Sequence, residues 1–229
     1  MRLTVNLPYP HAKQRAFLDS TAKRKVVCAG RRGGKTTGVS SYAVERMLAK
    51  KRVLYAAPTD DQTDTFWQAC KKALAEPIEA GVIYKNETKR ILEMPGGAGR
   101  IRAKTAWDAD SLRGDYGDDL ILEEYSLMDP SVWDEVGSPM LLDNDGNAIF
   151  IFTPKRKNHA FKAFQKAAAD ESGRWQAFHF VSHDNPYLSK EALAEITEDM
   201  SEDAYKQEIL AQFLEGEGAV FRGITDCID

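Results

Sequence analysis

The sequence predicts an α/β domain built on a mainly parallel sheet, with helices on both faces of that sheet. Three observations indicate this fold class. Short apolar runs alternate with helical patterns along the chain, as in successive β–α–β units. Leu120–Leu122 and Ile149–Phe152 are apolar at every position, which is typical of buried central strands. Val26–Ala29 leads directly into a glycine-rich turn, and a helical pattern follows that turn.

Length and composition limit the class of protein. The chain has 229 residues, of which 43% are hydrophobic and 29% charged, which suits one large α/β domain with a small appendage. It has no window of about 18 apolar residues and no signal-peptide pattern, so we expect no membrane span. The net charge of −4 argues against a protein that coats nucleic acid by bulk charge, although local basic patches are still allowed. Cys28, Cys70 and Cys227 have no metal-ligand spacing and indicate a reduced setting without structural zinc.

Further elements follow in order through the first half of the chain. Thr36–Lys50 repeats apolar residues at helical spacing directly after the glycine-rich turn. Arg52–Ala56 is a strand pattern that stops before a proline, and Asp60–Ala75 is helical again, with aromatic side chains available for burial. Arg90–Met94 and Arg100–Lys104 flank a Pro-Gly-Gly-Ala-Gly segment, which predicts a hairpin.

The last quarter of the chain is predicted to be helical. Asn185-Pro186 breaks the preceding pattern, and Ser189–Thr197 and Asp203–Leu214 then have helical spacing. Two glycines follow the second of these segments. We therefore predict a main domain over residues 1–183 and a helical appendage over residues 184–229.

The strongest signal for chemistry is the turn Gly30-Arg31-Arg32-Gly33-Gly34-Lys35-Thr36-Thr37. A strand, a glycine-rich turn and Gly-Lys-Thr at the start of a helix are the setting of a phosphate-binding P-loop. Gly33 and Gly34 allow backbone N–H groups to curve around phosphate oxygens, and the helix directs its positive end at them. We expect Lys35 to reach the terminal phosphates of ATP and the Thr36 hydroxyl to bind Mg²⁺. The simpler interpretation is a helix entered through a flexible loop.

Two arginines within this turn are unusual. A positive side chain at Arg31 or Arg32 would neutralise charge that builds on the γ-phosphate during hydrolysis. The alternative is that one or both side chains are solvated, and local chemistry favours neither for Arg31. The usual spacing of the motif has a glycine at position 29, where this chain has alanine.

A buried strand pattern ends in two carboxylates, Glu123 and Glu124. In a parallel sheet this end lies at the edge that also carries the P-loop. Glu123 is expected to hold Mg²⁺, although it is one methylene longer than the more usual aspartate. Glu124 is expected to orient and polarise the attacking water. The alternative is a surface acidic pair. A group of aspartates lies before this strand, and most are expected to be solvated loop or cap residues rather than a metal cluster: Asp108, Asp110, Asp115, Asp118 and Asp119.

Other candidate residues have weaker signals. Thr153 ends the Ile149–Phe152 strand and could hydrogen-bond the γ-phosphate or the catalytic water, but Thr-Pro is also a frequent loop start. The Gln14 amide could read an adenine edge, although an exposed glutamine on a helix is commoner. Lys155–Lys157 and Lys50–Arg52 are basic, and for each a solvated charge run is favoured over contact with DNA phosphates.

The ordered set of short motifs resembles the ATPase domain of bacteriophage large terminases. The motifs that carry the resemblance are Gln14, Gly30–Thr36, Ala57-Pro58-Thr59, Ser111-Leu112-Arg113-Gly114, Glu123-Glu124-Tyr125, Thr153-Pro154-Lys155, Asp184-Asn185-Pro186-Tyr187, Gln207-Glu208 and Gly218-Ala219-Val220-Phe221. Each motif is loose, whereas their order from end to end is specific. The Asn-Pro motif and the C-terminal motifs separate the series from general helicases.

The resemblance implies roles for individual residues. Lys35 and Thr36 match the phosphate and Mg²⁺ positions of the family, and Arg31 matches its P-loop arginine. Arg113 matches an arginine that is proposed to act on the ATP of a neighbouring subunit. Glu124 matches the catalytic glutamate and Thr153 the position that couples hydrolysis to movement. Three further matches are Gln14 with the adenine-reading position, Glu123 with a position that is normally aspartate, and Ala29 with a position where small residues are tolerated.

The resemblance also implies the fold subtype, the activity and the partners. We expect a P-loop NTPase αβα sandwich of the additional-strand, catalytic-glutamate type with a small helical lid, which hydrolyses ATP with Mg²⁺ to drive double-stranded DNA into a procapsid. The expected partners are a homo-oligomeric ring on the capsid portal and a small terminase subunit, in the host cytoplasm. Family members usually continue into a nuclease domain. This chain stops at Asp229, about where that domain would begin, so no cleavage activity is expected from it. The alternatives are a helicase-like DNA translocase and a catalytically degenerate DNA-binding assembly scaffold.

Overall fold

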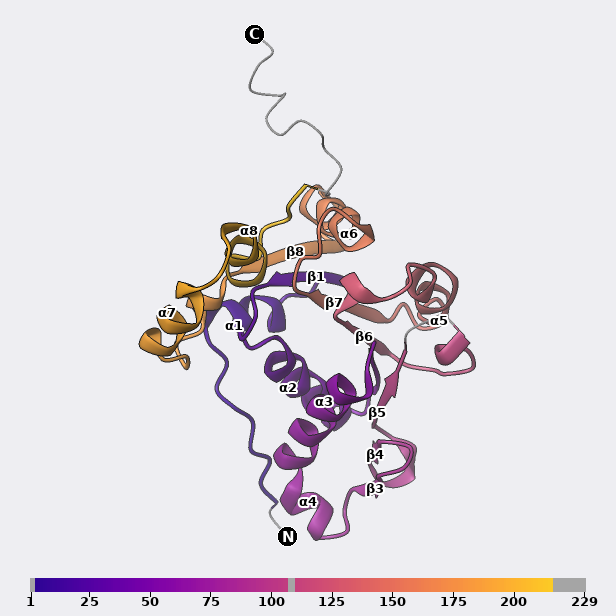
Figure 1. The fold of residues 1–229 in the computed structure, drawn as a ribbon. Coiled ribbons are helices and arrows are strands. Elements are labelled where there is room, and N and C mark those ends of the chain that lie inside the picture. The colour runs from indigo at the N-terminus through magenta and orange to yellow at the C-terminus, as the bar shows by residue number, and fades with distance from the viewer. Residues whose placement is uncertain (1–2, 107–109, 216–229) are drawn as a thin grey trace.

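The computed structural model describes residues 3–106 and 110–215, and its strands form one eight-stranded sheet (Figure 1). The strands are β1 (Arg24–Ala29), β2 (Arg52–Ala57), β3 (Tyr84–Asn86), β4 (Ile91–Glu93), β5 (Arg100–Thr105), β6 (Asp119–Glu123), β7 (Asn147–Phe152) and β8 (Trp175–Phe180). Their order across the sheet is β3-β4-β5-β2-β6-β7-β1-β8. The ladders β5–β2, β2–β6, β6–β7, β7–β1 and β1–β8 are parallel, and those of β4 with β3 and β5 are antiparallel. The predicted mainly parallel sheet is therefore confirmed.

Helices cover both faces of the sheet. Those on one face are α1 (Ala12–Leu18), α2 (Lys35–Leu48), α3 (Asp60–Ala73) and α4 (Ala75–Glu79), and those on the other are α5 (Ser138–Met140), the π-helix η4 (Val132–Gly137) and α6 (His159–Ala168) (Figure 1). Two more, α7 (Lys190–Glu198) and α8 (Glu202–Ala204), lie beyond the β8 edge and lead into the π-helix η6 (Tyr205–Ile209). Within the described part of the chain, no helix is both long and apolar enough to cross a bilayer.

Each central strand contributes side chains to two hydrophobic cores, because successive residues of a strand point to opposite faces. Along β7, Ile149 and Ile151 pack with α2 and α3, whereas Phe150 and Phe152 pack with α6 and η4. These residues are almost completely buried. The continuous apolar runs in the sequence follow from this burial on both sides, and they make the fold a three-layer αβα sandwich.

The sequence predicted the core elements and missed several others. The strands β1, β2, β6 and β7, the helices α2, α3 and α7, and the β4–β5 hairpin are confirmed with small shifts at their ends. Among the elements that were not predicted are α1, α4, β3, η4, α5, α6 and β8. Of these, β8 pairs with β1 along its whole length and so forms one edge of the sheet.

The predicted helix Asp203–Leu214 is wrong in its second half. Helical structure ends at Ile209, and Ala211 has a positive φ of 54°. Backbone carbonyls at this point accept bonds from outside the helix: the Glu208 oxygen accepts the Arg31 N–H at 2.7 Å, and the Ala211 oxygen accepts from His179 Nε2 at 3.1 Å. Tertiary contacts therefore end a helix that its own periodicity would continue.

The expectation that most acidic residues before β6 are solvated is also wrong for two of the four within the described part of the chain. Asp119 is 1% exposed and accepts bonds from Tyr42, Arg46 and Asn147. The Asp115 side chain is 4% exposed and pairs with Arg102 and Lys104. Asp108 lies outside the described residues. Among the described residues, no group of three or more His, Cys, Asp or Glu could hold a metal ion.

Candidate nucleotide-binding and catalytic site

The carboxyl ends of three neighbouring strands meet at one pocket. Sheet order places β6, β7 and β1 side by side, and their parallel direction brings the ends at Glu123, Phe152 and Ala29 to the same edge. The pocket has a volume of about 580 Å³ and is lined by Arg31, Arg32, Gly34, Lys35, Thr36, Thr37, Thr65, Glu123, Glu124, Asn185 and Leu188. A smaller pocket of about 110 Å³ includes Arg31, Glu124, Thr153 and Glu208.

The start of α2 is built to receive an anion. Gly34 has a φ of 86°, the left-handed conformation that glycine adopts without steric cost, and the helix begins at the next residue. The backbone N–H groups of Lys35, Thr36 and Thr37 donate no hydrogen bond within the described part of the chain. A fourteen-residue helix adds its positive dipole end to these unused donors, so the loop favours phosphate oxygens.

Side chains from distant segments hold the carbonyl groups of the P-loop. Each carbonyl from residue 30 to residue 34 accepts a bond from a side chain, which leaves the opposite side of the loop for a ligand. The pairs are Gly30 with Lys35 Nζ (3.2 Å), Arg31 with Ser182 Oγ (2.6 Å), Arg32 with Asn185 Nδ2 (2.7 Å), Gly33 with His11 Nε2 (3.0 Å) and Gly34 with Gln14 Nε2 (2.7 Å). The loop conformation therefore depends on residues 11–14 and 182–185.

Lys35 connects the P-loop to the end of β7. Its side chain is 7% exposed, and Nζ donates to the Ala29 and Gly30 carbonyls at 3.1 and 3.2 Å and to Thr153 Oγ1 at 2.7 Å. Nζ also lies 4.0 Å from Glu124 Oε1. The structure thus brings Lys35, Thr153 and Glu124 together, and the ammonium lies where it can neutralise a terminal phosphate.

The two glutamates differ in environment although they are adjacent. Glu123 is 4% exposed; Tyr55 Oη donates to its Oε2 at 2.5 Å, and Thr36 Oγ1 donates to its Oε1. Burial raises the pKa of the Glu123 carboxyl, and the bonds from Thr36 and Tyr55 oppose this rise. Glu124 is partly exposed and faces both pockets. Two roles can therefore be divided between them, with Glu123 placed beside Thr36 and Glu124 open to water.

Glu124 has a strained backbone. Its φ of 50° lies in the left-handed region, which costs a residue other than glycine about 1–2 kcal/mol. The strain turns the side chain back toward the end of β7, where Oε2 accepts the Thr153 N–H at 3.2 Å. Strained residues of this kind cluster at functional sites, because the surrounding structure has to hold them in place.

The side chains of Arg31 and Arg113 have acidic partners within the protein. Arg31 is largely exposed and pairs with Glu208 at 3.2 Å, while Arg32 lines the larger pocket. Arg113 pairs with Asp110 at 2.6 Å and Glu135 at 3.2 Å, and it is not among the described residues that line the two pockets.

Gln14 is buried rather than exposed. Its amide accepts the His11 N–H at 2.9 Å and donates to the Gly34 carbonyl, so in this conformation it holds the P-loop.

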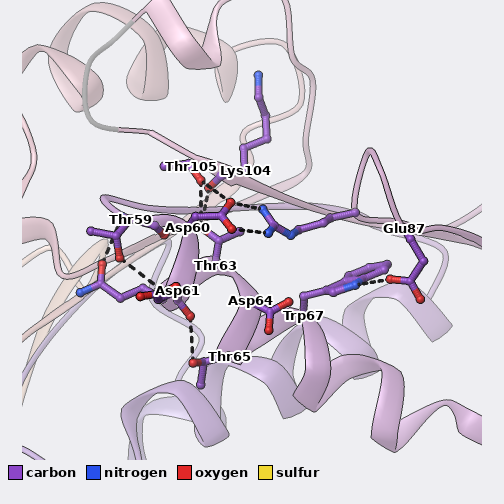
Figure 2. Close-up of polar contacts among 12 residues, drawn as sticks. Thr59, Asp60, Asp61, Thr63, Asp64, Thr65, Trp67, Glu87, Lys104 and Thr105 are labelled. Carbon is purple, nitrogen blue, oxygen red and sulfur yellow. Dashed lines mark hydrogen bonds and ion pairs between the residues drawn. The ribbon is translucent and has the colours of Figure 1, made fainter.

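Helix α3 lines the site through Gln62 and Thr65, and Figure 2 shows the polar contacts that fix its first turn. Thr59 caps the helix by accepting the Gln62 N–H at 3.4 Å. Asp60 accepts two bonds from Arg90, at 2.7 and 2.8 Å, and lies beside Thr105. Thr65, on the next turn, lines the larger pocket. The wall beside the P-loop is therefore held by both a helix cap and an ion pair to the neighbouring hairpin.

Sequence reasoning missed four residues that shape the site. Ser182 and His11 carry no local signal, and Asn185 was interpreted only as part of a helix breaker. Tyr55 lies in the middle of a correctly predicted strand, where nothing in the sequence indicates that its hydroxyl meets Glu123. These residues act through contacts between segments that are far apart in the chain.

A glycine is required at position 30 by packing. A Cβ placed there would lie 2.4 Å from the Ile209 carbonyl oxygen and 2.6 Å from Ser182 Oγ. We expect Gly30→Ala to displace the segment around Ile209 and to lower the free energy of unfolding by about 1–3 kcal/mol, the usual cost of overpacking. Thermal and urea unfolding measure this loss. Gly173→Asn is the control, since no atom lies within 4 Å of its added Cβ and asparagine tolerates the positive φ of 73°; equal stability of the two variants would contradict the packing argument.

The residues at this site fit a magnesium-bound nucleoside triphosphate. Unused amide groups and Lys35 suit the phosphates, and the Thr36 hydroxyl and Glu123 carboxylate are the hard oxygen ligands that Mg²⁺ prefers. No cluster among the described residues supplies enough side chains to hold a metal alone. A Mg²⁺ ion shares its coordination with phosphate and water, so two protein oxygens are sufficient.

Comparisons with known proteins agree on one family. The family model described as "Terminase large subunit, T4likevirus-type, N-terminal" matches residues 26–225. The terminase large subunit of Thermus virus P23-45 is 30% identical over 246 residues, which cover 94% of this chain and 51% of that protein. The terminase large subunit of Escherichia phage T5 is 25% identical, over 90% of this chain and 47% of its own. This chain thus spans about half the length of the curated relatives that it matches.

Solved structures show the same fold. The large terminase ATPase domain of Thermus phage P74-26 superimposes with a TM-score of 0.76 at 28% identity, covering 90% of this chain and 94% of that one. The HK97 bacteriophage large terminase has a TM-score of 0.75 at 13% identity, covers 90% of this chain and 51% of that one, and is similar in fold alone. The P-loop NTPase sandwich, the arrangement of the site and the match over residues 26–225 lead to one conclusion: this chain belongs to the terminase large subunit family and corresponds to its N-terminal ATPase region.

Proposed function

We propose that this chain binds ATP with Mg²⁺, hydrolyses it, and uses the energy to move double-stranded DNA into a phage procapsid. One observation carries the proposal: Lys35, Glu124 and Thr153 lie in the segments that follow three neighbouring strands, and they meet beside the unused amide groups of α2. The large terminase ATPase domain of Thermus phage P74-26, which has the same fold at 28% identity, supports the same activity.

The chemistry requires positioning and charge neutralisation. Lys35 and the α2 amide groups bind and orient the phosphates. Glu124, open to solvent at the pocket, accepts a proton from the attacking water as the water oxygen bonds to the γ-phosphorus. The bond from that phosphorus to the β–γ bridging oxygen breaks, and the electron pair leaves with ADP. Mg²⁺, when bound at Thr36 and Glu123, supplies positive charge that withdraws electrons from the phosphate oxygens. Arg31 adds a second positive side chain at the mouth of the pocket.

Thr153 is proposed to couple the nucleotide state to the rest of the domain. Its hydroxyl accepts from Lys35 and its N–H donates to Glu124, so it contacts both groups that act on the phosphate. The basic segment Lys155–Lys157 follows it directly along the chain. A change at the phosphate therefore has a short route to a surface with local positive charge.

The test is phosphate release from ATP, measured with Mg²⁺ or with excess EDTA, and with or without duplex DNA. The proposal predicts release that requires Mg²⁺ and responds to DNA. Absence of release under all four conditions would support a degenerate scaffold. The helicase-like translocase is not favoured, because the comparisons identify terminases.

A ring of subunits is proposed from the place of Arg113. This side chain lies outside the pocket linings and is held by Asp110 and Glu135, and it is more than half exposed, so it is available to a neighbouring subunit. We expect Arg113→Ala to bind ATP normally and to lose most turnover, since an arginine supplied by a neighbouring subunit typically raises kcat by about 10³–10⁵-fold.

Mixing variants tests whether Arg113 acts between subunits. Combining Arg113→Ala with Glu124→Gln should restore part of the ATPase activity, because some interfaces then have an intact arginine and an intact glutamate. No recovery, in mixtures shown to co-assemble, would mean that Arg113 does not act in a neighbour. A capsid portal, a small terminase subunit and a following nuclease domain are further proposed partners, in the host cytoplasm.

A further inference from the structure

The Glu123 carboxylate is held at both of its oxygens. Thr36 Oγ1 donates to Oε1, and Tyr55 Oη donates to Oε2 at 2.5 Å. Thr36 lies on the wall of the pocket, whereas Tyr55 approaches from β2, the strand beside β6. The carboxylate is therefore fixed from the protein interior on one side and meets the nucleotide site on the other.

Tyr55 is itself closely packed. Its side chain has no exposed surface, and its ring stacks on Phe66 of α3 with centroids 3.7 Å apart and planes within 6°. The hydroxyl lies 3.5 Å from the Gln62 carbonyl, a weaker contact than the one to Glu123. A buried phenol needs a hydrogen-bond partner, and here that partner is the carboxylate.

We propose that Tyr55 is a positioning residue for Glu123: its hydroxyl holds Oε2 so that Oε1 stays directed at Thr36, where the two oxygens together would bind Mg²⁺. This inference rests on the proposed function. A glutamate has one more rotatable bond than an aspartate, so more rotamer freedom is lost when it is fixed at a metal site. The phenol removes that freedom before the metal arrives. Partners that orient a metal ligand typically change metal affinity or activity by about 10- to 100-fold when they are removed.

Tyr55→Phe tests the proposal with a minimal change. The ring and its stack on Phe66 remain, and only the hydroxyl is lost. Binding of a fluorescent ADP analogue is measured with Mg²⁺ and again with EDTA. We expect the gain in affinity that Mg²⁺ provides to fall by about 10-fold or more, and the affinity in EDTA to stay as in the unmodified protein. Electron paramagnetic resonance titration with Mn²⁺ and ADP reports the same loss at the metal itself.

Tyr42→Phe is a matched control, because Tyr42 of α2 contacts the opposite end of β6 from the end that Tyr55 contacts. Tyr42 is also buried, and its hydroxyl also donates to a carboxylate, that of Asp119 at 2.7 Å. Asp119 begins β6, whereas Glu123 ends it. Loss of the Tyr42 hydroxyl should lower stability without changing the effect of Mg²⁺. If both variants change the Mg²⁺ dependence equally, Tyr55 contributes only to stability and the proposal fails.

A double variant separates positioning from general damage. In a Glu123→Gln background the carboxylate that Tyr55 positions is gone, so adding Tyr55→Phe should change the Mg²⁺ dependence little further. Simple addition of the two effects would overturn the proposal. If Mg²⁺ does not raise the ADP affinity of the unmodified protein, the proposed function itself fails. If Mg²⁺ raises the ADP affinity of Tyr55→Phe as much as that of the unmodified protein, only the proposed role of Tyr55 is refuted.

Discussion

A Glu124→Gln variant is expected to bind ATP and to lose nearly all turnover. The amide keeps the size of the side chain and can still accept the Thr153 N–H, but it cannot take a proton from water. General-base catalysis by a positioned side chain typically contributes about 10²–10⁴-fold, so kcat should fall by that factor. Single-turnover phosphate release and equilibrium binding of labelled ATP measure the two quantities separately.

The matched control is Glu76→Gln, which removes a carboxylate from α4, outside both pocket linings. Its turnover and ATP affinity should equal those of the unmodified protein. An ATPase rate for Glu124→Gln that is within experimental error of that control would refute the assignment of Glu124 as the base, and Glu123 would then need testing.

A Lys35→Met variant is expected to lose nucleotide affinity as well as turnover. The ammonium that binds the terminal phosphates disappears, and hydrogen bonds to charged groups are worth about 1.5–3 kcal/mol, or about 10- to 100-fold in affinity. Loss of positive charge in the transition state should lower kcat by about another 10²–10³-fold. The variant also leaves Thr153 Oγ1 and the Ala29 and Gly30 carbonyls without this donor, so the free energy of unfolding should fall.

Lys25→Met distinguishes these effects. Lys25 lies on β1, the strand that leads into the P-loop, and is also buried; it donates to the Phe17 carbonyl at 2.8 Å, and burial lowers its pKa to about 8. Its replacement should change stability and leave ATP affinity as it was. Nucleotide affinity that is unaltered in Lys35→Met, or equally reduced in both variants, would show that Lys35 does not bind the phosphates.

The parts of the fold that the sequence predicts are those whose pattern is local. The strands β6 and β7 are apolar at every residue because both faces are covered, and the turn before α2 needs glycine for its left-handed conformation. Both requirements act within a few residues. The convergence of Lys35 with Glu123 and Glu124 also follows, because parallel strands bring their carboxyl ends to one edge.

The remaining elements depend on contacts with residues that are distant in the sequence, which a local pattern does not indicate. Strand β8 alternates only weakly and lies at the sheet edge, where one side has no strand to bury it. The seven residues of α1 are too few for a clear period, and their cap uses His11 and Gln14. Helix η6 ends where the Arg31 N–H and the Ser182 hydroxyl donate hydrogen bonds to its last carbonyl groups.

Charge was the least predictable property at the level of single residues. Asp115 and Asp119 occupy a segment rich in aspartate and glycine, which is typical of solvated loops, yet each is buried with two or more donors. Within the site, the buried Glu123 carboxylate likewise depends on a donor from another strand, the Tyr55 hydroxyl. A buried charge depends on which donors the fold brings from elsewhere, so it becomes visible only in three dimensions.

The support of the P-loop carbonyls by residues 11–14 and 182–185 has a consequence for synthesis. A nascent chain emerges from the ribosome in order, and a domain generally folds as a unit. The loop itself is made early, but half of its supporting side chains follow β8, some 150 residues later. We therefore expect the loop to reach its nucleotide-binding conformation late in synthesis, after the sheet is complete.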